Sequence, residues 1–405
     1  MIQRGWVFAI AGLLLFELNA FGQLDPEKRR LIQIGNNLPL EGSAPIAGYG
    51  FYYYNNPSFI NTNMTLRLAV APIYLDGELG FKGVLTPETD IGIGMAGGGF
   101  GDTYSELRGG RYIKEESFWG HTAEISSSIY QRLNPDWRVP MWWIARAGLH
   151  HAFYDRSSDT ADNFMIPDDV NSINIRTGFR LGGKEPMINT PVALELSAWY
   201  EAHLRDNAQT YGFGDRHIES ASHTFWGRAL LKYTFEESQQ YFDVSFTLGT
   251  SINADRFSAY RLGGMLPLVS EFPLSIPGYF FQEISATKFG LINAEYSFPI
   301  TPGKNWRVSF FGAAALVDYL QGLELPEDWQ AGVGTGVTWV SPRGAWLISL
   351  LYGHGINSIR NGDEGSNQVG FLFQYDFDAV KKYRFRRFEP TVSPYGTSGG
   401  ERIFH

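Results

Sequence analysis

The feature that most constrains this chain is a strict alternation of apolar and polar residues, which recurs along its length. In the stretch 192–201, VALELSAWYE, every even-numbered position is apolar, and both glutamates and the serine fall on odd-numbered positions. The stretch 367–377, NQVGFLFQYDF, repeats the pattern and ends on the aromatic Phe377. Successive side chains of a strand point to opposite faces, so a period of two predicts β-strands with one apolar face.

Two classes of protein alternate in this way. A soluble sandwich turns its apolar faces inward, whereas a membrane barrel turns them toward lipid and joins its strands by short turns at one end and longer loops at the other. Short connections are predicted at 134–140, 184–191, 235–240, 299–305 and 340–344. Long ones are predicted at 154–171, 205–222, 255–286, 321–328 and 354–366. This long–short rhythm favours an all-β, transmembrane antiparallel β-barrel.

The number of strands follows from the same pattern. About fifteen strand-like segments begin near Ile46, and single-chain bacterial barrels normally have an even number of strands. We therefore expect a further strand within 99–120, where glycines and charges blur the alternation, and sixteen strands in all. Fourteen strands are the alternative.

The N-terminus predicts export. Arg4, the apolar run 6–16 and the small residues Ala20 and Gly22 form the pattern of a secretory signal peptide. We expect a signal peptide at 1–22, a short periplasmic segment at 23–44, the barrel at 45–377 and a periplasmic tail at 378–405. The absence of cysteine excludes an acylated lipoprotein and any disulfide. Further apolar runs of about 18 residues, which helical spans require, are absent.

Charge and histidine placement argue against several kinds of site. The net charge of −9 argues against a nucleic-acid partner, because phosphate binding favours a basic face. The eight histidines are scattered, and His150 and His151, being adjacent in a strand, point to opposite faces. We therefore predict no catalytic, cofactor-binding or metal-binding residues, and no enzymatic activity.

The C-terminal third is the most distinctive part of the sequence. It contains RLGG (261–264), a long loop, AEYSFPI (294–300), LVDY (316–319) and the glycine-rich stretch GVGTGVTWVSPRGAWLISLLYG (332–353). This order resembles the BamA/TamA-like surface-antigen superfamily of outer-membrane proteins. The resemblance implies a sixteen-stranded barrel in which the loop after the eleventh strand folds into the lumen. It also implies that five strands follow the loop, and the sequence predicts five.

The resemblance also implies candidate functional residues. The loop of the superfamily usually carries an Arg-Gly-aromatic tip that pairs with an acid on the wall. Here LVSEF (268–272) or IPGY (276–279) stands at the tip, with Ser270 or Pro277 in place of arginine, and Asp318 matches the wall acid. The loop candidates are Arg261, Gly263, Gly264, Ser270, Glu271, Phe272, Pro277, Gly278 and Tyr279. The assembly signal by which such barrels are recognised matches Gln368, Gly370, Phe373, Tyr375 and Phe377.

The implied function is the insertion or translocation of proteins or lipids at the outer membrane of a Gram-negative type of cell, through a lateral gate between the first and last strands. A passive pore, or an accessory barrel in a larger complex, is the alternative. The periplasmic repeat domains common in the superfamily have no room in 23–44, so we expect a bare barrel. The expected partners are outer-membrane lipids and other outer-membrane or periplasmic proteins, and the sequence does not define an oligomeric state. The tail carries a basic cluster suited to anionic headgroups or a partner: Lys381, Lys382, Arg384, Arg386 and Arg387.

Overall fold

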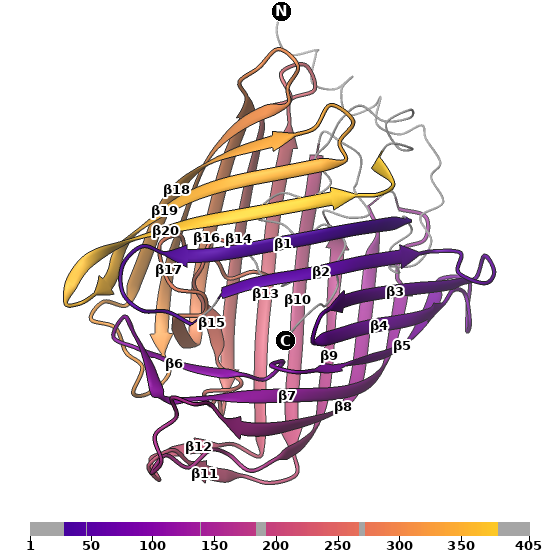
Figure 1. Cartoon of the computed structure of the whole chain (residues 1–405). Helices are drawn as coiled ribbons and strands as arrows, with labels where there is room; N and C mark the ends of the chain where they lie inside the picture. Colours follow the sequence, from indigo (N-terminus) through magenta and orange to yellow (C-terminus); the bar gives the residue numbers. More distant parts are fainter. Residues whose placement is uncertain (1–27, 46, 138, 184–191, 267–271, 380–405) are drawn as a thin grey trace, which may run out of the picture.

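A computed structural model describes residues 28–45, 47–137, 139–183, 192–266 and 272–379. The described chain is all-β, and its main sheet has 18 strands. Two of these are short side strands, so sixteen form the wall of a barrel (Figure 1). The wall strands are β1 (Arg29–Pro39), β2 (Ala47–Asn56), β3 (Met64–Ala71), β4 (Tyr74–Phe81), β5 (Thr89–Gly98), β7 (Arg111–Arg132), β8 (Met141–Arg156), β9 (Val170–Gly182), β10 (Val192–Arg205), β13 (Ala221–Thr234), β14 (Tyr241–Ile252), β16 (Ile284–Pro299), β17 (Trp306–Tyr319), β18 (Trp329–Val340), β19 (Trp346–Arg360) and β20 (Asp363–Asp376). The side strands are β6 (Tyr104–Arg108) and β15 (Tyr260–Leu262), and β11 (Gln209–Tyr211) and β12 (Arg216–Ile218) form a separate hairpin.

The barrel is closed by the pairing of its first and last wall strands. Each wall strand pairs antiparallel with its neighbours along the chain, and β1 also pairs with β20, from Leu31 opposite Asp376 to Pro39 opposite Gln368. Figure 1 shows β1 lying between β2 and β20. The predicted all-β barrel of sixteen strands is confirmed.

The first wall strand is not where the sequence suggested. The fifteen strands from Ala47 onward match the predicted fifteen, but the sixteenth is β1, within the segment assigned to the periplasm, and the barrel begins at Arg29. The predicted wall strand within 99–120 is wrong, because β6 pairs with β7 alone and forms a hairpin in a long connection. The alternation of β1 is hard to detect because Arg30 and Asn36 interrupt its outward apolar face.

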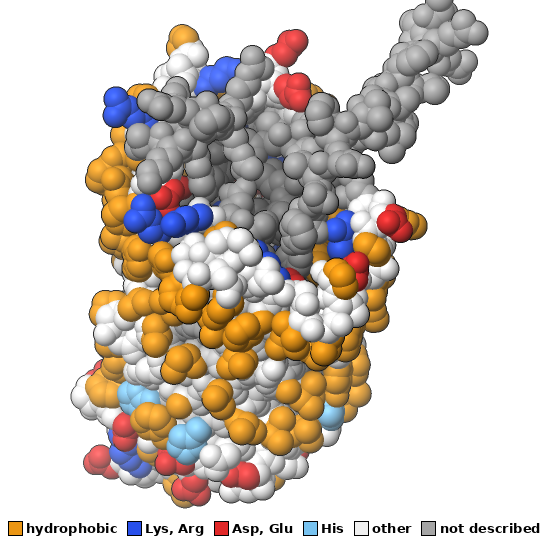
Figure 2. All heavy atoms as spheres, turned by 90° about the vertical axis from the view of Figure 1, so that its right-hand side faces the viewer, with side chains coloured by type: hydrophobic (Ala, Val, Ile, Leu, Met, Phe, Trp, Pro, Cys, Tyr) orange, Lys and Arg blue, Asp and Glu red, His pale blue; other side chains and the backbone are white. Residues whose placement is uncertain are grey.

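The two faces of the wall have opposite character. Outward side chains such as Leu149, 62% exposed, are apolar, whereas the inward Glu195, Ser349 and Gln374 are buried. In Figure 2 apolar side chains cover the middle of the visible face, and charged and histidine side chains gather toward its lower end. A soluble sandwich would bury its apolar faces, so apolar side chains outside and polar ones inside favour a membrane barrel. Among the described residues there is no helix with the length and apolar character of a membrane span.

The barrel has two unlike ends. Connections such as 57–63 and 133–140 lie at one end, which we call the turn end, and β1 starts and β20 finishes there. The connections 99–110, 206–220 and 253–283 lie at the opposite end, the loop end.

Further hydrogen bonds reinforce the β1–β20 seam along its length. At the turn end Arg30 donates two hydrogen bonds to Asp378, at 2.8 and 3.1 Å. Within the lumen the Gln33 amide donates to Gln374 at 3.1 Å. At the loop end the Leu40 backbone N–H donates to the carbonyl of Asn367 at 2.9 Å.

The seam register predicts a disulfide. The chain has no cysteine, so the pair Gln33→Cys/Gln374→Cys is expected to oxidise, because the two residues are directly paired. In the control Gln33→Cys/Gln368→Cys the second position is six residues away along β20, roughly 20 Å, and both thiols should stay free. Loss of thiol labelling under non-reducing conditions measures the outcome. Labelling of both thiols in the first pair would contradict the closure.

Candidate functional site

The connection at 253–283 is the candidate site, and we call it the inner loop. It follows β14, the eleventh wall strand, and five wall strands come after it, as predicted. Six of its described apolar side chains are almost completely buried, although the loop has little regular secondary structure. They are Leu262, Met265, Leu266, Ile276, Tyr279 and Phe280.

The inner loop contacts the seam. The side-chain amide of Asn37, on the inner face of β1, accepts a hydrogen bond from the Leu266 N–H at 3.0 Å and donates to the Leu266 carbonyl at 3.3 Å. Met265 lies against inward glycines of the last two strands, because a Cβ built at Gly353 or Gly370 would lie 2.6 or 3.2 Å from Met265 atoms. This part of the loop therefore bridges β1, β19 and β20.

A second contact lies at Pro277–Gly278–Tyr279. Gly278 has a φ of 84°, and a Cβ there would lie 1.9 Å from the backbone nitrogen of Gly355 in β19. Glycine is needed at that position for both its conformation and the close approach of two backbones. The Tyr279 hydroxyl donates to the side-chain oxygen of Gln330, on the inner face of β18, at 2.6 Å.

A buried ion pair anchors the end of the inner loop. Arg360, the last residue of β19, contacts both carboxylate oxygens of Glu283 at 2.7 Å. Its guanidinium carbon also lies 3.6 Å from the ring centroid of Phe280. Both charged side chains are almost fully buried, so each depends on the other for compensation.

The third contact is on the far wall. Phe272 packs against Trp199 of β10 and Trp226 of β13, with ring centroids 5.5 and 6.0 Å apart. The guanidinium carbons of Arg228 and Arg176 lie 4.5 and 5.4 Å from its centroid. Residues of the inner loop thus contact inward side chains of both β1 and β13, and these contacts place them inside the barrel, across the lumen.

The structure places most predicted loop residues in contact with the wall, at separate points. Phe272, Pro277, Gly278 and Tyr279 make the contacts above, and Ser270 and Glu271 lie outside the described residues. Near them Arg261, on β15, donates to the Gln282 carbonyl at 3.0 Å. Gly263 and Gly264, with φ of 128° and 83°, follow it at the start of the loop's path inward.

Asp318 does not act as the wall acid in this structure. It points outward from β17, is 64% exposed and pairs with Lys288 at 3.0 Å. The wall groups that do contact the loop were missed by sequence reasoning: Asn37, Gln330 and Arg360. One signal could have located the contact surface, because Gly332, Gly353 and Gly355 fall on the inward side of their strands, where a glycine leaves room for a second backbone.

The predicted assembly residues all lie on or beside the closing strand. Gln368 and Gly370 face the lumen, whereas Phe373 and Tyr375 face outward against Trp346, with centroids 5.5 and 4.6 Å apart. Phe377 follows the strand and packs on Tyr375 at 4.7 Å. Their role in assembly stays a prediction, and the basic cluster at 381–387 lies outside the described residues.

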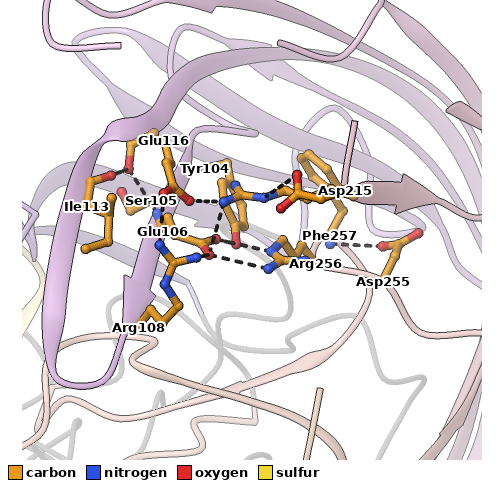
Figure 3. Close-up of polar contacts among 12 residues, drawn as sticks. Tyr104, Ser105, Glu106, Arg108, Ile113, Glu116, Asp215, Asp255, Arg256 and Phe257 are labelled. Carbon is orange, nitrogen blue, oxygen red and sulfur yellow. Dashed lines mark hydrogen bonds and ion pairs between the residues drawn. The ribbon is translucent and has the colours of Figure 1, made fainter. Parts of the chain in front are cut away.

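A charged cluster joins three connections at the loop end. Glu106 of β6, fully buried, lies 3.2 Å from Arg256 of the inner loop, 3.6 Å from Arg108 and 3.5 Å from Arg216 of β12. Figure 3 shows Arg108 and Arg256 converging on this carboxylate. Arg216 also pairs with Glu116. The cluster therefore ties the β6–β7 hairpin, the β11–β12 hairpin and the inner loop to one another.

An aromatic cluster lies beside these charges. Phe118 lies 5.6 Å from Tyr104 and 6.2 Å from both Phe164 and Tyr211, measured between ring centroids. Burial raises the pKa of the Tyr211 phenol well above its ordinary value, as expected for a hydroxyl without access to water. The connections at the loop end thus pack into a buried aromatic cluster together with Phe118 of the wall strand β7.

Among the residues that the structure describes, no group of three histidine or acidic side chains is placed to hold a metal ion.

Comparison with known proteins gives structural matches. No family model matches the sequence. No curated protein matches it either. BamA from Haemophilus ducreyi lacking POTRA domains 1–3 matches with a TM-score of 0.55 and 12% identity, over 87% of this chain and 71% of that one. The chain has the fold of such barrels.

Two further structures have the same fold. CdiB from Acinetobacter baumannii matches with a TM-score of 0.56 and 11% identity, over 86% of this chain and 60% of that one. CdiB from Escherichia coli matches with a TM-score of 0.55 and 13% identity, over 86% and 63%. The chain spans less than two thirds of either CdiB protein. The predicted resemblance to the BamA/TamA-like superfamily is confirmed at the level of the fold.

The buried ion pair predicts a loss of stability. Arg360→Met leaves the Glu283 carboxylate buried without its partner, which costs about 3–5 kcal/mol of unfolding free energy. The control Lys288→Met removes one partner of the exposed Asp318 pair and should cost less than about 1 kcal/mol. Urea titration of the refolded barrel in detergent measures both. Equal losses in the two variants would show that the Glu283–Arg360 pair does not anchor the loop.

The loop-end cluster predicts a change in exposure. Glu106→Gln keeps the side-chain shape but leaves Arg108, Arg216 and Arg256 with less negative charge to hold them together. External trypsin should then cleave at this cluster faster than in the parent protein. Asp159→Asn is the control, because its contact with Lys114 is 4.0 Å long and exposed. Unchanged cleavage of the Glu106 variant would mean that aromatic packing alone holds the cluster.

Proposed function

We propose that this protein inserts or translocates polypeptides or lipids at the outer membrane. The barrel fold and its likeness to BamA and CdiB support the outer-membrane location. The proposed partners are outer-membrane lipids and other outer-membrane or periplasmic proteins. The role itself comes from the superfamily resemblance and from the construction of the lumen.

The observation that carries the proposal is the path of the inner loop. A passive pore needs a continuous aqueous lumen, whereas here the loop contacts the seam through Asn37 and the far wall through Phe272. The wall provides small residues for it, since a Cβ at Gly332 would lie 2.0 Å from the Pro277 carbonyl oxygen. A loop that fits against the inner wall is not expected of an open diffusion channel. It favours a protein that acts through its wall strands.

Depletion of the protein tests the proposal. We expect the outer membrane to lose one or more barrel proteins or surface lipoproteins, because their insertion or export then lacks this step. Quantitative proteomics of isolated outer membranes measures the loss. Rescue by the parent protein and by the Lys288→Met control should be complete, and rescue by Arg360→Met should be reduced because the loop loses its anchor.

An unchanged outer-membrane proteome after depletion would overturn the proposal. Large, steady, ion-selective currents from the purified barrel in planar bilayers would favour the passive pore instead.

A further inference from the structure

Within the part of the chain that the structure describes, one stretch of the wall has a partner strand on one side alone. Strand β2 pairs with β1 from Asn55 to Ala47, but its ladder with β3 covers Tyr52 to Asn56 alone. Among the described residues, Ala47 to Gly50 therefore pair on the β1 side and have no backbone partner on the other side. We call these four residues the free edge.

The free edge results from a short hairpin. Strands β3 and β4 have 8 residues each and are joined through Pro72 and Ile73 alone. Membrane-spanning strands need about 9–11 residues, so the hairpin ends before its neighbour does. The tip is apolar, and Ile73 is 54% exposed, as expected for a turn that stays within the apolar layer instead of reaching water. Figure 1 shows β2 continuing past the end of β3.

The surroundings of the free edge are mostly apolar as well. On the β1 side the outward Ile34 and Leu38 are exposed, with the polar Asn36 between them, and on the hairpin side Val70 and Leu75 are exposed. Where a strand edge lies in the apolar layer of a membrane, its backbone N–H and C=O groups have no water to bond, and open sheet edges are not stable in hydrocarbon. In the membrane this edge therefore requires a partner that provides donors and acceptors.

The chemistry of the edge selects an extended polypeptide. A strand offers N–H and C=O groups in the repeat that the edge presents, and an acyl chain offers neither. The outward residues at the edge are Gly48 and Gly50, which leave room for another backbone to approach. A Cβ at Gly50 would meet Ile34 at 3.7 Å and one at Gly48 would meet the Asn36 amide at 3.3 Å, so the described atoms that approach these two positions belong to β1.

The terminal segments of the chain that the structure does not describe join the wall at the opposite end from the free edge. Residues 1–27 lead into Arg29 and residues 380–405 follow β20, and both junctions are at the turn end. Ala47 is at the loop end, at the other end of the β1–β2 pair. Either segment would have to run back along the wall by roughly 30 Å to reach Ala47, whereas a strand from another protein can arrive at the loop end directly.

We propose that the free edge of β2 docks an extended segment of a client outer-membrane protein by adding it as a strand to the wall. This inference rests on the proposed function and specifies its client and its place. The dock lies beside the seam but does not require β1 and β20 to separate.

A site-specific photo-crosslinking amino acid at Gly50 in the full-length protein, produced in its own cells, tests the dock. The control carries it at Gly312, another outward glycine, which lies in β17 and is paired on both sides. We expect a crosslinked product at Gly50 that mass spectrometry maps to an alternating strand of another outer-membrane protein. The control at Gly312 should give no such product. The product should persist when the Gln33→Cys/Gln374→Cys disulfide locks the seam.

Other outcomes overturn the dock. Crosslinks at Gly50 to lipid, to residues 380–405 or to a second copy of this chain would assign the edge another occupant. Client crosslinks at Asn36, outward on β1, that vanish in the seam-locked protein would move the client to the seam and leave the proposed function intact. Absence of any client crosslink together with an unchanged proteome on depletion would remove both.

Discussion

The structure depends on one requirement, that the backbone groups of every strand find partners without water. In hydrocarbon an unpaired N–H or C=O group costs several kcal/mol, so a sheet survives there by closing on itself. The β1–β20 ladder achieves this, and Arg30, Gln33 and Leu40 extend its hydrogen bonding beyond the backbone of the strands. The same requirement makes the free edge of β2 an exception that needs a physical account.

Much of the wall could be predicted from sequence, because apolar and polar residues alternate in strands that separate lipid from lumen. A strand between lipid and lumen has to alternate, and β10 does so without a break from Val192 to Tyr200. Strand β1 escaped prediction because it does not keep to that rule. Its outward Arg30 is satisfied by Asp378, a residue 348 positions away, and no local pattern reveals such a compensation. Its position shortly after a signal-like sequence further suggested a periplasmic segment.

The inner loop shows what sequence could not provide. Its position before the last five strands follows from counting strands, but its anchors are long-range pairs with no periodicity. The resemblance led us to expect Asp318 as the wall acid, with Ser270 or Pro277 in place of arginine at the loop tip. Here the buried ion pair has its acid, Glu283, on the loop and its base, Arg360, on the wall. Asp318 points outward instead and pairs with Lys288 at the surface.

The inner loop, the seam and the free edge are joined to one another by direct contacts and strand pairing. Asn37 binds the loop on the β1 side, Met265 fills the space above Gly353 and Gly370, and Arg360 holds the loop end to β19. These contacts all fall on strands next to the seam, so the loop holds β1 against β20 from the inside. Strand β2 is joined to these strands by its β1 ladder, while its loop-end half has no second neighbour among the described residues. Because β2 is held on its β1 side, a strand can be added at its free edge while the β1–β20 ladder stays closed.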